Sequence, residues 1–278
     1  MAIDLFSIGR FTVHGYGLMI GLGFLAAVFA GSYLAKRRGL SESDFTNMAM
    51  LVLVLGFAGG KLLHIIVEFK MFISDPMSVL GSEGFVVYGG ILSGIATIYV
   101  YCRIKKLEFL EYLDIFATAV PVNQAFGRVG CLLAGCCYGK VTDSAFSIVF
   151  PDKCMAPAHV RLIPTQPIMA AGNFVIFIVL TVIYISGCPK KSGDDTVGHR
   201  VRAGLETSLY LILYSAGRFV IEFFRDDERG EVGILTTSQF IALFTFAAGV
   251  VLLMIWKKRS QSPGSDDRAS DKVDQEKV

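Results

Sequence analysis

Seven apolar stretches constrain this chain more than any other feature of its sequence. A membrane-spanning helix needs about 20 consecutive, mostly apolar residues. Stretches close to that length cover residues 16–35, 45–67, 85–101, 112–134, 167–186, 205–223 and 237–256. A helix of a soluble bundle shows a polar face to water, and the segment 174–185 has none. The sequence therefore predicts an all-α integral membrane protein with seven transmembrane helices.

The composition agrees with this fold class. Of the 278 residues, 53% are hydrophobic and 18% are charged, whereas soluble domains carry about 25% charged residues. The net charge of +2 says nothing about nucleic acid, but no basic run is interleaved with aromatic residues, so we expect no nucleic acid partner. The first residues lack the basic region and the cleavage site of a signal peptide, so we expect the first apolar helix to be retained.

Basic residues follow alternate apolar stretches, which predicts the orientation of the chain. They follow the first, third, fifth and seventh stretches: Lys36, Arg37, Arg38, Arg103, Lys105, Lys106, Lys190, Lys191, Arg200, Arg202, Lys257, Lys258 and Arg259. Cytoplasmic loops are enriched in Lys and Arg. We therefore expect the N-terminus outside and the C-terminus in the cytoplasm. An odd number of spans fits this orientation, because it places the two termini on opposite sides of the membrane.

The polar segments define the expected domain organisation. Residues 1–259 are predicted to form one membrane domain, and its largest extracytoplasmic loop, residues 135–166, contains three prolines and is expected to form a small cap. Residues 260–278 contain almost no apolar side chains to bury. They are predicted to be a disordered cytoplasmic tail.

Three ionisable residues inside the apolar stretches are expected at one depth. Arg128 belongs to the fourth stretch, and Arg218 and Glu222 belong to the sixth. With the predicted orientation, all three lie in the outer half of the bilayer. A buried arginine costs about 2.5–3.5 kcal/mol on insertion scales, so its presence predicts a functional site. Because a guanidinium binds phosphate through two hydrogen bonds, the sequence predicts a phospholipid headgroup as the ligand.

Simpler interpretations stay open for several of these residues. Arg218, Glu222 and Arg225 are spaced to share one helix face, so they also fit an ion network that only ties helices together. Tyr16 and Tyr88 are expected at the outer ends of the first and third stretches. Tyrosines at such positions commonly anchor helices at the membrane interface.

Four of the six cysteines, Cys131, Cys136, Cys137 and Cys154, fall on the predicted outer side, where disulfides persist. A bridge from Cys136 or Cys137 to Cys154 would pin the cap loop. Nearby arginine would lower the pKa of a thiol, which makes a nucleophilic Cys136 or Cys137 an alternative. A further alternative is that the cysteines bind zinc or an iron–sulfur cluster, but the C-x4-CC-x16-C spacing matches no common ligand pattern. We therefore expect no metal.

At these residues the chain resembles the prolipoprotein diacylglyceryl transferase family, because several motifs occur in that family's order. The motifs are HGYGLMIGLGF from residue 14, YGGILSG from 88, GRVGCLLAGCCYG from 127, PTQP from 164 and GRFVIEFFR from 217. The resemblance covers residues 11–256. It implies seven spans, an outer N-terminus and a multi-pass protein of the bacterial inner membrane whose site faces the outer leaflet.

The resemblance also implies a reaction. The family moves the diacylglyceryl group of phosphatidylglycerol onto the lipobox cysteine thiol of a prolipoprotein, and glycerol phosphate leaves. This is the first step of bacterial lipoprotein maturation. The expected partners are therefore phosphatidylglycerol, prolipoproteins and membrane lipid, and no cofactor is expected.

The site residues implied by the resemblance are specific positions of this sequence. Arg128 matches the family's phospholipid-binding arginine, and Arg218 and Glu222 match its R-F-x-x-E motif. Tyr16 matches the tyrosine of the first motif, and Gly139 matches the closing glycine. We expect the two arginines to bind the phosphate and Glu222 to orient Arg218.

Three positions depart from the family pattern. The usual H-G-G is Tyr88, Gly89 and Gly90 here, and the usual asparagine and glutamate are Cys131 and Cys136. With an unperturbed pKa of about 10, a tyrosine is a poorer base than the histidine it replaces. We expect Tyr88, like Tyr16, to hydrogen-bond the substrate or relay the thiol proton, and the glycines to line the substrate site.

Two other functions stay open at this point. The first is a relative on the same scaffold, whose altered residues handle another lipid or acceptor. The second is a non-enzymatic lipid-binding or redox membrane protein that uses the outer thiols of Cys131, Cys136 and Cys137.

Overall fold

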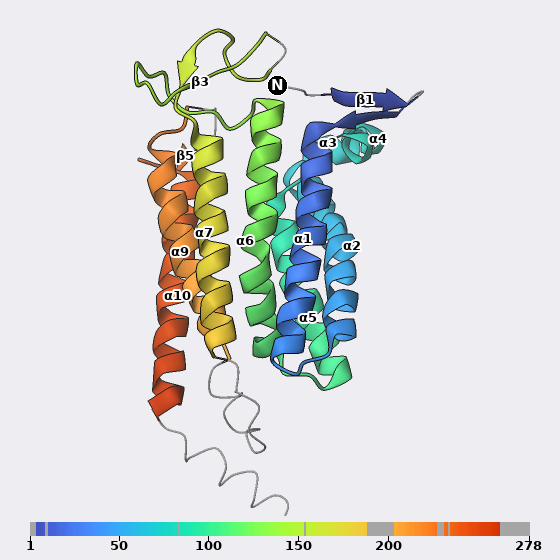
Figure 1. Ribbon diagram of the computed structural model, residues 1–278. Coiled ribbons are helices and arrows are strands. Elements are labelled where there is room, and N and C mark those ends of the chain that lie inside the picture. The colour runs from blue at the N-terminus through green and yellow to red at the C-terminus, as the bar shows by residue number, and fades with distance from the viewer. Residues whose placement is uncertain are drawn as a thin grey trace, which may run out of the picture. The chain divides into compact units, whose positions relative to one another are not determined.

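The computed structural model describes residues 4–8, 11–82, 84–152, 154–187, 203–226, 231–232 and 234–261. The chain divides into two units, unit 1 (Met1–Leu34 with Asp114–Val278) and unit 2 (Ala35–Leu113). The long helices of the described residues are α1 (Gly15–Arg37), α2 (Glu42–Val67), α5 (Val87–Lys105), α6 (Phe109–Ala134), α7 (Thr165–Ser186), α9 (Leu205–Glu222) and α10 (Thr237–Gln261) (Figure 1). Each of them coincides with one predicted apolar stretch.

Short elements connect the long helices. Helices α3 (Phe69–Ser74) and α4 (Pro76–Gly81) lie between α2 and α5. Three antiparallel hairpins are formed by β1 (Asp4–Ile8) with β2 (Phe11–His14), β3 (Ile148–Val149) with β4 (Arg161–Leu162), and β5 (Glu231–Val232) with β6 (Leu235–Thr236). These hairpins were not predicted, because pairs of two to five residues leave no periodic apolar signal in the sequence.

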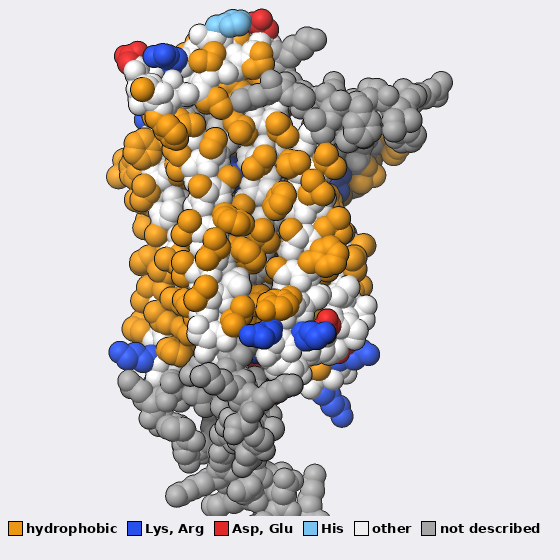
Figure 2. Space-filling model, viewed as in Figure 1, with side chains coloured by type: hydrophobic (Ala, Val, Ile, Leu, Met, Phe, Trp, Pro, Cys, Tyr) orange, Lys and Arg blue, Asp and Glu red, His pale blue; other side chains and the backbone are white. Residues whose placement is uncertain are grey.

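Five of the long helices, α1, α2, α5, α7 and α10, are long and apolar enough to cross a membrane. Their large side chains lie outside the packed interior: Phe29 is 74% exposed, Phe57 61% and Phe244 63%. Hydrophobic side chains follow the helices, and Lys and Arg side chains lie near helix ends (Figure 2). Apolar surface of this extent belongs in lipid rather than in water. Helices α6 and α9 are not among these five, so the count of seven spans stays a prediction.

Within unit 1, α6 and α9 run side by side in the same direction. The fully buried carboxylate of Asp114 accepts hydrogen bonds from the backbone N–H groups of Gly204 (2.6 Å) and Thr207 (2.9 Å). It thereby satisfies donors that a helix N-terminus leaves without partners. Further along the pair, Gln124 donates to the hydroxyl of Tyr210 at 2.8 Å. The register between α6 and α9 is therefore fixed by polar contacts.

Within unit 2, α2 and α5 pack together through glycines. A Cβ atom on Gly89 would lie 2.7 Å from the Cβ of Leu63 and closer still to the carbonyl oxygen of Gly59. A Cβ on Gly90 would lie 3.2 Å from the carbonyl oxygen of Gly56. Small residues permit this close approach of two helix backbones in a membrane. Gly89 and Gly90 therefore have a packing role between these helices.

Replacement of Gly89 by valine should separate α2 from α5. Because the added atoms meet backbone that cannot move aside, we expect a loss of stability of about 1–3 kcal/mol. Thermal unfolding of the detergent-solubilised protein measures this loss. Gly81→Ala is the matched control in the same unit, since a Cβ there meets nothing within 4 Å. Equal stability of the Gly89→Val variant and the control would contradict the packing role.

Candidate functional site

Several helix ends of unit 1 meet at residues 135–164, here called the cap segment. The backbone carbonyl of Cys136 accepts a hydrogen bond from the side chain of Gln166 at 2.9 Å, which joins the end of α6 to the start of α7. The backbone N–H of Lys140 donates to the carbonyl of Phe224 at 2.9 Å, just past the end of α9. The cap segment has its own small apolar core, formed by Phe150, Ala156 and Leu162.

Two glycines shape the start of the cap segment. Gly135 has a φ of +71° and ends α6 in the left-handed conformation that glycine adopts at no steric cost. Gly139 pairs with Arg225 in an isolated antiparallel bridge. A Cβ on Gly139 would lie 2.5 Å from the carbonyl oxygen of Ile163. Gly139 is therefore enclosed by backbone, so its described contacts are structural.

Arg128 lies on α6, two turns before that helix ends, and is partly buried. Its guanidinium donates a hydrogen bond to Cys137 and lies within range of charge interactions with Cys131 and Tyr214. Among the described residues, no Asp or Glu lies within ion-pair distance of it. The charge of Arg128 is therefore surrounded by thiols and a phenol and lacks a carboxylate partner in the described part of the chain.

Arg218 has a different environment. It forms an ion pair with Glu222 through Nη1 and donates from Nη2 to the hydroxyl of Ser238 at 2.9 Å. Glu222 also accepts a hydrogen bond from the hydroxyl of Thr236 at 3.0 Å. The side chains of Arg218 and Glu222 are 12% and 2% exposed. The ion pair holds the guanidinium of Arg218 against Glu222, and the same network ties α9 to the start of α10.

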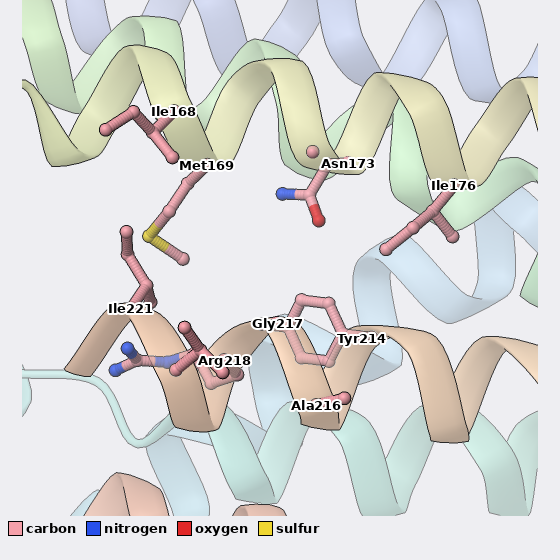
Figure 3. Close-up of a pocket in the computed structure, with 11 residues that line it drawn as sticks. Ile168, Met169, Asn173, Ile176, Tyr214, Ala216, Gly217, Arg218 and Ile221 are labelled. Carbon is pink, nitrogen blue, oxygen red and sulfur yellow. The ribbon is translucent and has the colours of Figure 1, made fainter. Parts of the chain in front are cut away.

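An apolar groove lies between α7 and α9 beside Arg218, with a volume of about 410 Å³. Figure 3 shows Met169 and Asn173 on α7 facing Arg218 and Tyr214 on α9. The side-chain nitrogen of Asn173 is buried without a hydrogen-bond partner in the described residues. The groove thus combines apolar walls with a few polar groups, which suits an amphiphilic ligand.

The position predicted for Arg225 is wrong. The spacing placed it on one helix face with Arg218 and Glu222, but α9 ends at Glu222 and the chain then turns. Arg225 is 6% exposed and pairs with Gly139 of the cap segment. Because Arg225 lies beyond the end of α9, its side chain is near Cys137 rather than on the helix face of Arg218 and Glu222.

The sulfur atoms of Cys131, Cys136 and Cys137 all lie within 4.8 Å of one another. Cys131 is on α6, and the left-handed turn at Gly135 folds the next two cysteines back over it. Hydrogen bonds from the thiols of Cys131 and Cys136, with the charges of Arg225 and Arg128, hold the pKa of the Cys137 thiol below its ordinary value.

The bridge from Cys136 or Cys137 to Cys154, which the sequence left open, is not formed in this structure. Among the described residues, no disulfide joins any of Cys102, Cys131, Cys136, Cys137 and Cys154. Cys188 lies outside the described residues. Cys154 packs against the apolar core of the cap segment. Its partners are therefore apolar side chains, and Cys136 and Cys137 face Cys131 instead.

The two tyrosines proposed from the sequence belong to different units. Tyr16 begins α1 in unit 1, is 44% exposed, and is in electrostatic contact with Arg128 and the three clustered thiols. A Cβ on Gly130 would lie 3.1 Å from its ring, so Tyr16 packs directly on α6. Tyr88 lies at the start of α5 in unit 2 and is 42% exposed.

The model of the prolipoprotein diacylglyceryl transferase family matches residues 4–255 of the chain. This chain belongs to that family. Among its relatives is the phosphatidylglycerol–prolipoprotein diacylglyceryl transferase of Clostridium tetani, which is 41% identical over 92% of this chain and 98% of its own length. A second transferase of Clostridium perfringens is 37% identical over 94% of this chain and 98% of its own length. The transferase of Finegoldia magna is 31% identical over 91% of this chain and 95% of its own length.

These comparisons confirm the resemblance expected from the motifs. Together with its five apolar helices, membership of the diacylglyceryl transferase family makes the chain a multi-pass integral membrane protein. The hairpins noted above do not alter this class, since they are confined to the connections and ends of the long helices.

Sequence reasoning missed several residues at the candidate site of this family member. Tyr214 interacts electrostatically with Arg128 and lines the groove beside Arg218. Asn173 and Ser238 contribute polar groups from α7 and α10. A polar residue inside an apolar stretch can indicate a site residue, and Asn173 is the clearest of these three examples.

Proposed function

We propose that this family member transfers the diacylglyceryl group of phosphatidylglycerol to the lipobox cysteine thiol of prolipoproteins, in the bacterial inner membrane. The observation that carries the proposal is the environment of Arg128. It is a partly buried guanidinium without a carboxylate partner among the described residues. A charge held in this way attracts an anion, and the phosphate of a phospholipid supplies one at the bilayer surface.

The reaction breaks one bond and forms another at the glycerol C3 carbon. The acceptor thiolate attacks that carbon, and the carbon–oxygen bond to the phosphate breaks. The electron pair of that bond leaves with the phosphate oxygen, so glycerol phosphate departs as an anion. Arg128 stabilises the negative charge that develops on this oxygen. The acceptor thiol has an ordinary pKa of about 8.5, so it needs only modest help to ionise.

The neighbouring groups have supporting roles in this proposal. Arg218, oriented by Glu222, provides a second cation, and the adjoining groove accepts an acyl chain along its apolar walls. Its volume of about 410 Å³ falls within the usual range for ligand pockets, about 300–1,000 Å³. Tyr16, which lies near Arg128, hydrogen-bonds the substrate or relays the thiol proton.

The proposed membrane arrangement has seven spans within residues 1–259, an outer N-terminus and a site facing the outer leaflet. Helices α6 and α9 are included although they are more polar. Two of their buried carboxylates have polar partners inside unit 1: Asp114 of α6 caps the start of α9, and Glu222 of α9 pairs with Arg218. Paired in this way, ionisable residues are tolerated within a membrane domain.

A reconstituted assay tests the function. The purified protein in vesicles containing labelled phosphatidylglycerol should add one diacylglyceryl group to a lipobox peptide, detected as a mass increase. The same peptide with serine in place of its cysteine should stay unmodified. Release of glycerol phosphate without peptide modification would indicate a relative that serves another acceptor. Neither product, from protein that also fails to complement a transferase-depleted strain, would contradict an enzymatic role.

A further inference from the structure

We propose that Cys131, Cys136 and Cys137 form a binding site for a soft, thiophilic metal ion, coordinated by their three sulfur atoms. The site does not depend on the transferase reaction, and none of the three thiols has a role in the mechanism above. The spacing of these cysteines predicted no metal site, and the left-handed conformations of Gly135 and Cys137 bring the three sulfur atoms together.

The distances between the sulfur atoms suit three-sulfur coordination. They all lie within 4.8 Å of one another. A metal–sulfur bond of about 2.3 Å in a tetrahedral site places two ligand sulfurs about 3.8 Å apart. Side-chain rotations that move each sulfur by less than about 1 Å would therefore complete the site. Three protein ligands leave the fourth position of such a site open to water.

The surroundings favour thiolate ligands. Binding of the ion releases the three thiol protons to solvent, because thiolate is the ligating form. The guanidinium groups of Arg128 and Arg225 lie in electrostatic contact with Cys137. Their two positive charges offset most of the negative charge of three thiolates. Cys131 is buried while Cys136 and Cys137 are partly exposed, so an ion can reach the cluster.

The ligand set selects the class of ion. The described cluster offers sulfur donors and no carboxylate or imidazole. Thiolates select soft or borderline ions such as Cu⁺ and Zn²⁺, whereas hard ions such as Mg²⁺ prefer oxygen. Cd²⁺ is a suitable probe, since its bonds to thiolates produce an ultraviolet charge-transfer absorption that free Cd²⁺ lacks.

The test titrates Cd²⁺ into the purified full-length protein, reduced with a phosphine and kept free of oxygen. We expect one equivalent to bind with the thiolate absorption, and excess Mg²⁺ to leave it bound. Separate Cys131→Ser, Cys136→Ser and Cys137→Ser variants should each weaken binding at least tenfold. Cys154→Ser is the matched control, because Cys154 lies outside the three-sulfur cluster, and it should bind as the wild type does.

If the serine variants fail to fold, a measurement on the wild-type protein still tests the proposal. Alkylation followed by mass spectrometry reports each cysteine separately, with and without Cd²⁺. We expect Cd²⁺ to protect Cys136 and Cys137 together and to leave the reactivity of Cys154 unchanged. Unchanged alkylation of Cys136 and Cys137, or a thiolate absorption that persists in all three serine variants, would overturn the proposal.

Discussion

Arg128→Ala should abolish transfer of the diacylglyceryl group to a lipobox peptide. The guanidinium is proposed both to hold the phospholipid phosphate and to stabilise the leaving oxygen. Loss of a single donor to a developing oxyanion typically slows an enzyme about 10²–10³-fold, and loss of a full charge should exceed that. Because Arg128 has no carboxylate partner among the described residues, its removal leaves no carboxylate unpaired, so the fold should survive.

The initial rate of peptide modification, measured in vesicles of fixed phosphatidylglycerol content, tests this expectation. Arg128→Lys keeps the charge but loses the planar pair of donors, so it should recover only a small part of the rate. Arg161→Ala is the control, since Arg161 is an exposed arginine on β4 of the same unit. Wild-type rates in Arg128→Ala would remove Arg128 from the proposed mechanism.

Glu222→Ala should destabilise the protein and also lower its activity. The substitution leaves Arg218 charged, largely buried and without its carboxylate. Breaking a buried ion pair on one side costs about 3–5 kcal/mol. Thermal or denaturant unfolding of the solubilised protein measures that cost. Loss of the hydrogen bond from Thr236 should add to it.

A double variant separates stability from catalysis at this pair. Arg218→Met with Glu222→Met removes both charges, so it should be more stable than Glu222→Ala and still be impaired in transfer. Glu42→Ala serves as the control, because Glu42 pairs with Lys36 at an exposed site, where an ion pair contributes roughly 0–1 kcal/mol. If Glu222→Ala proved as mild as Glu42→Ala, the Arg218–Glu222 pair would have no special structural role.

The helices were predictable because their signal is local. Each long helix corresponds to an apolar run long enough to cross a bilayer. The predicted and observed helix bounds agree to within a few residues. Helix α10 is the largest extension at a C-terminal end, since it continues to Gln261 rather than ending at residue 256. The predicted tail, residues 260–278, lies almost wholly outside the described residues.

The arrangement of the site was less predictable because it depends on turns and on contacts distant in sequence. One left-handed glycine, Gly135, decides that Cys136 and Cys137 face Cys131 rather than Cys154. The end of α9 at Glu222 decides that Arg225 joins the cap segment. Charged residues in apolar runs identified Arg128 and Arg218, whereas Tyr214 looked like any aromatic residue of a transmembrane helix.

The cap that Asp114 places on α9 acts as a distant anchor for the arginine site. Arg128 lies about 21 Å further along α6, at 1.5 Å per residue, and there it interacts electrostatically with Tyr214 of α9. A slip of α9 by one turn would remove the hydrogen bonds to Asp114 and also shift Tyr214 away from Arg128. The alignment of Arg128 with Tyr214 is thus set from the opposite end of the α6–α9 pair. A substitution that removes the Asp114 cap would therefore misalign these two side chains, although Asp114 is far from both.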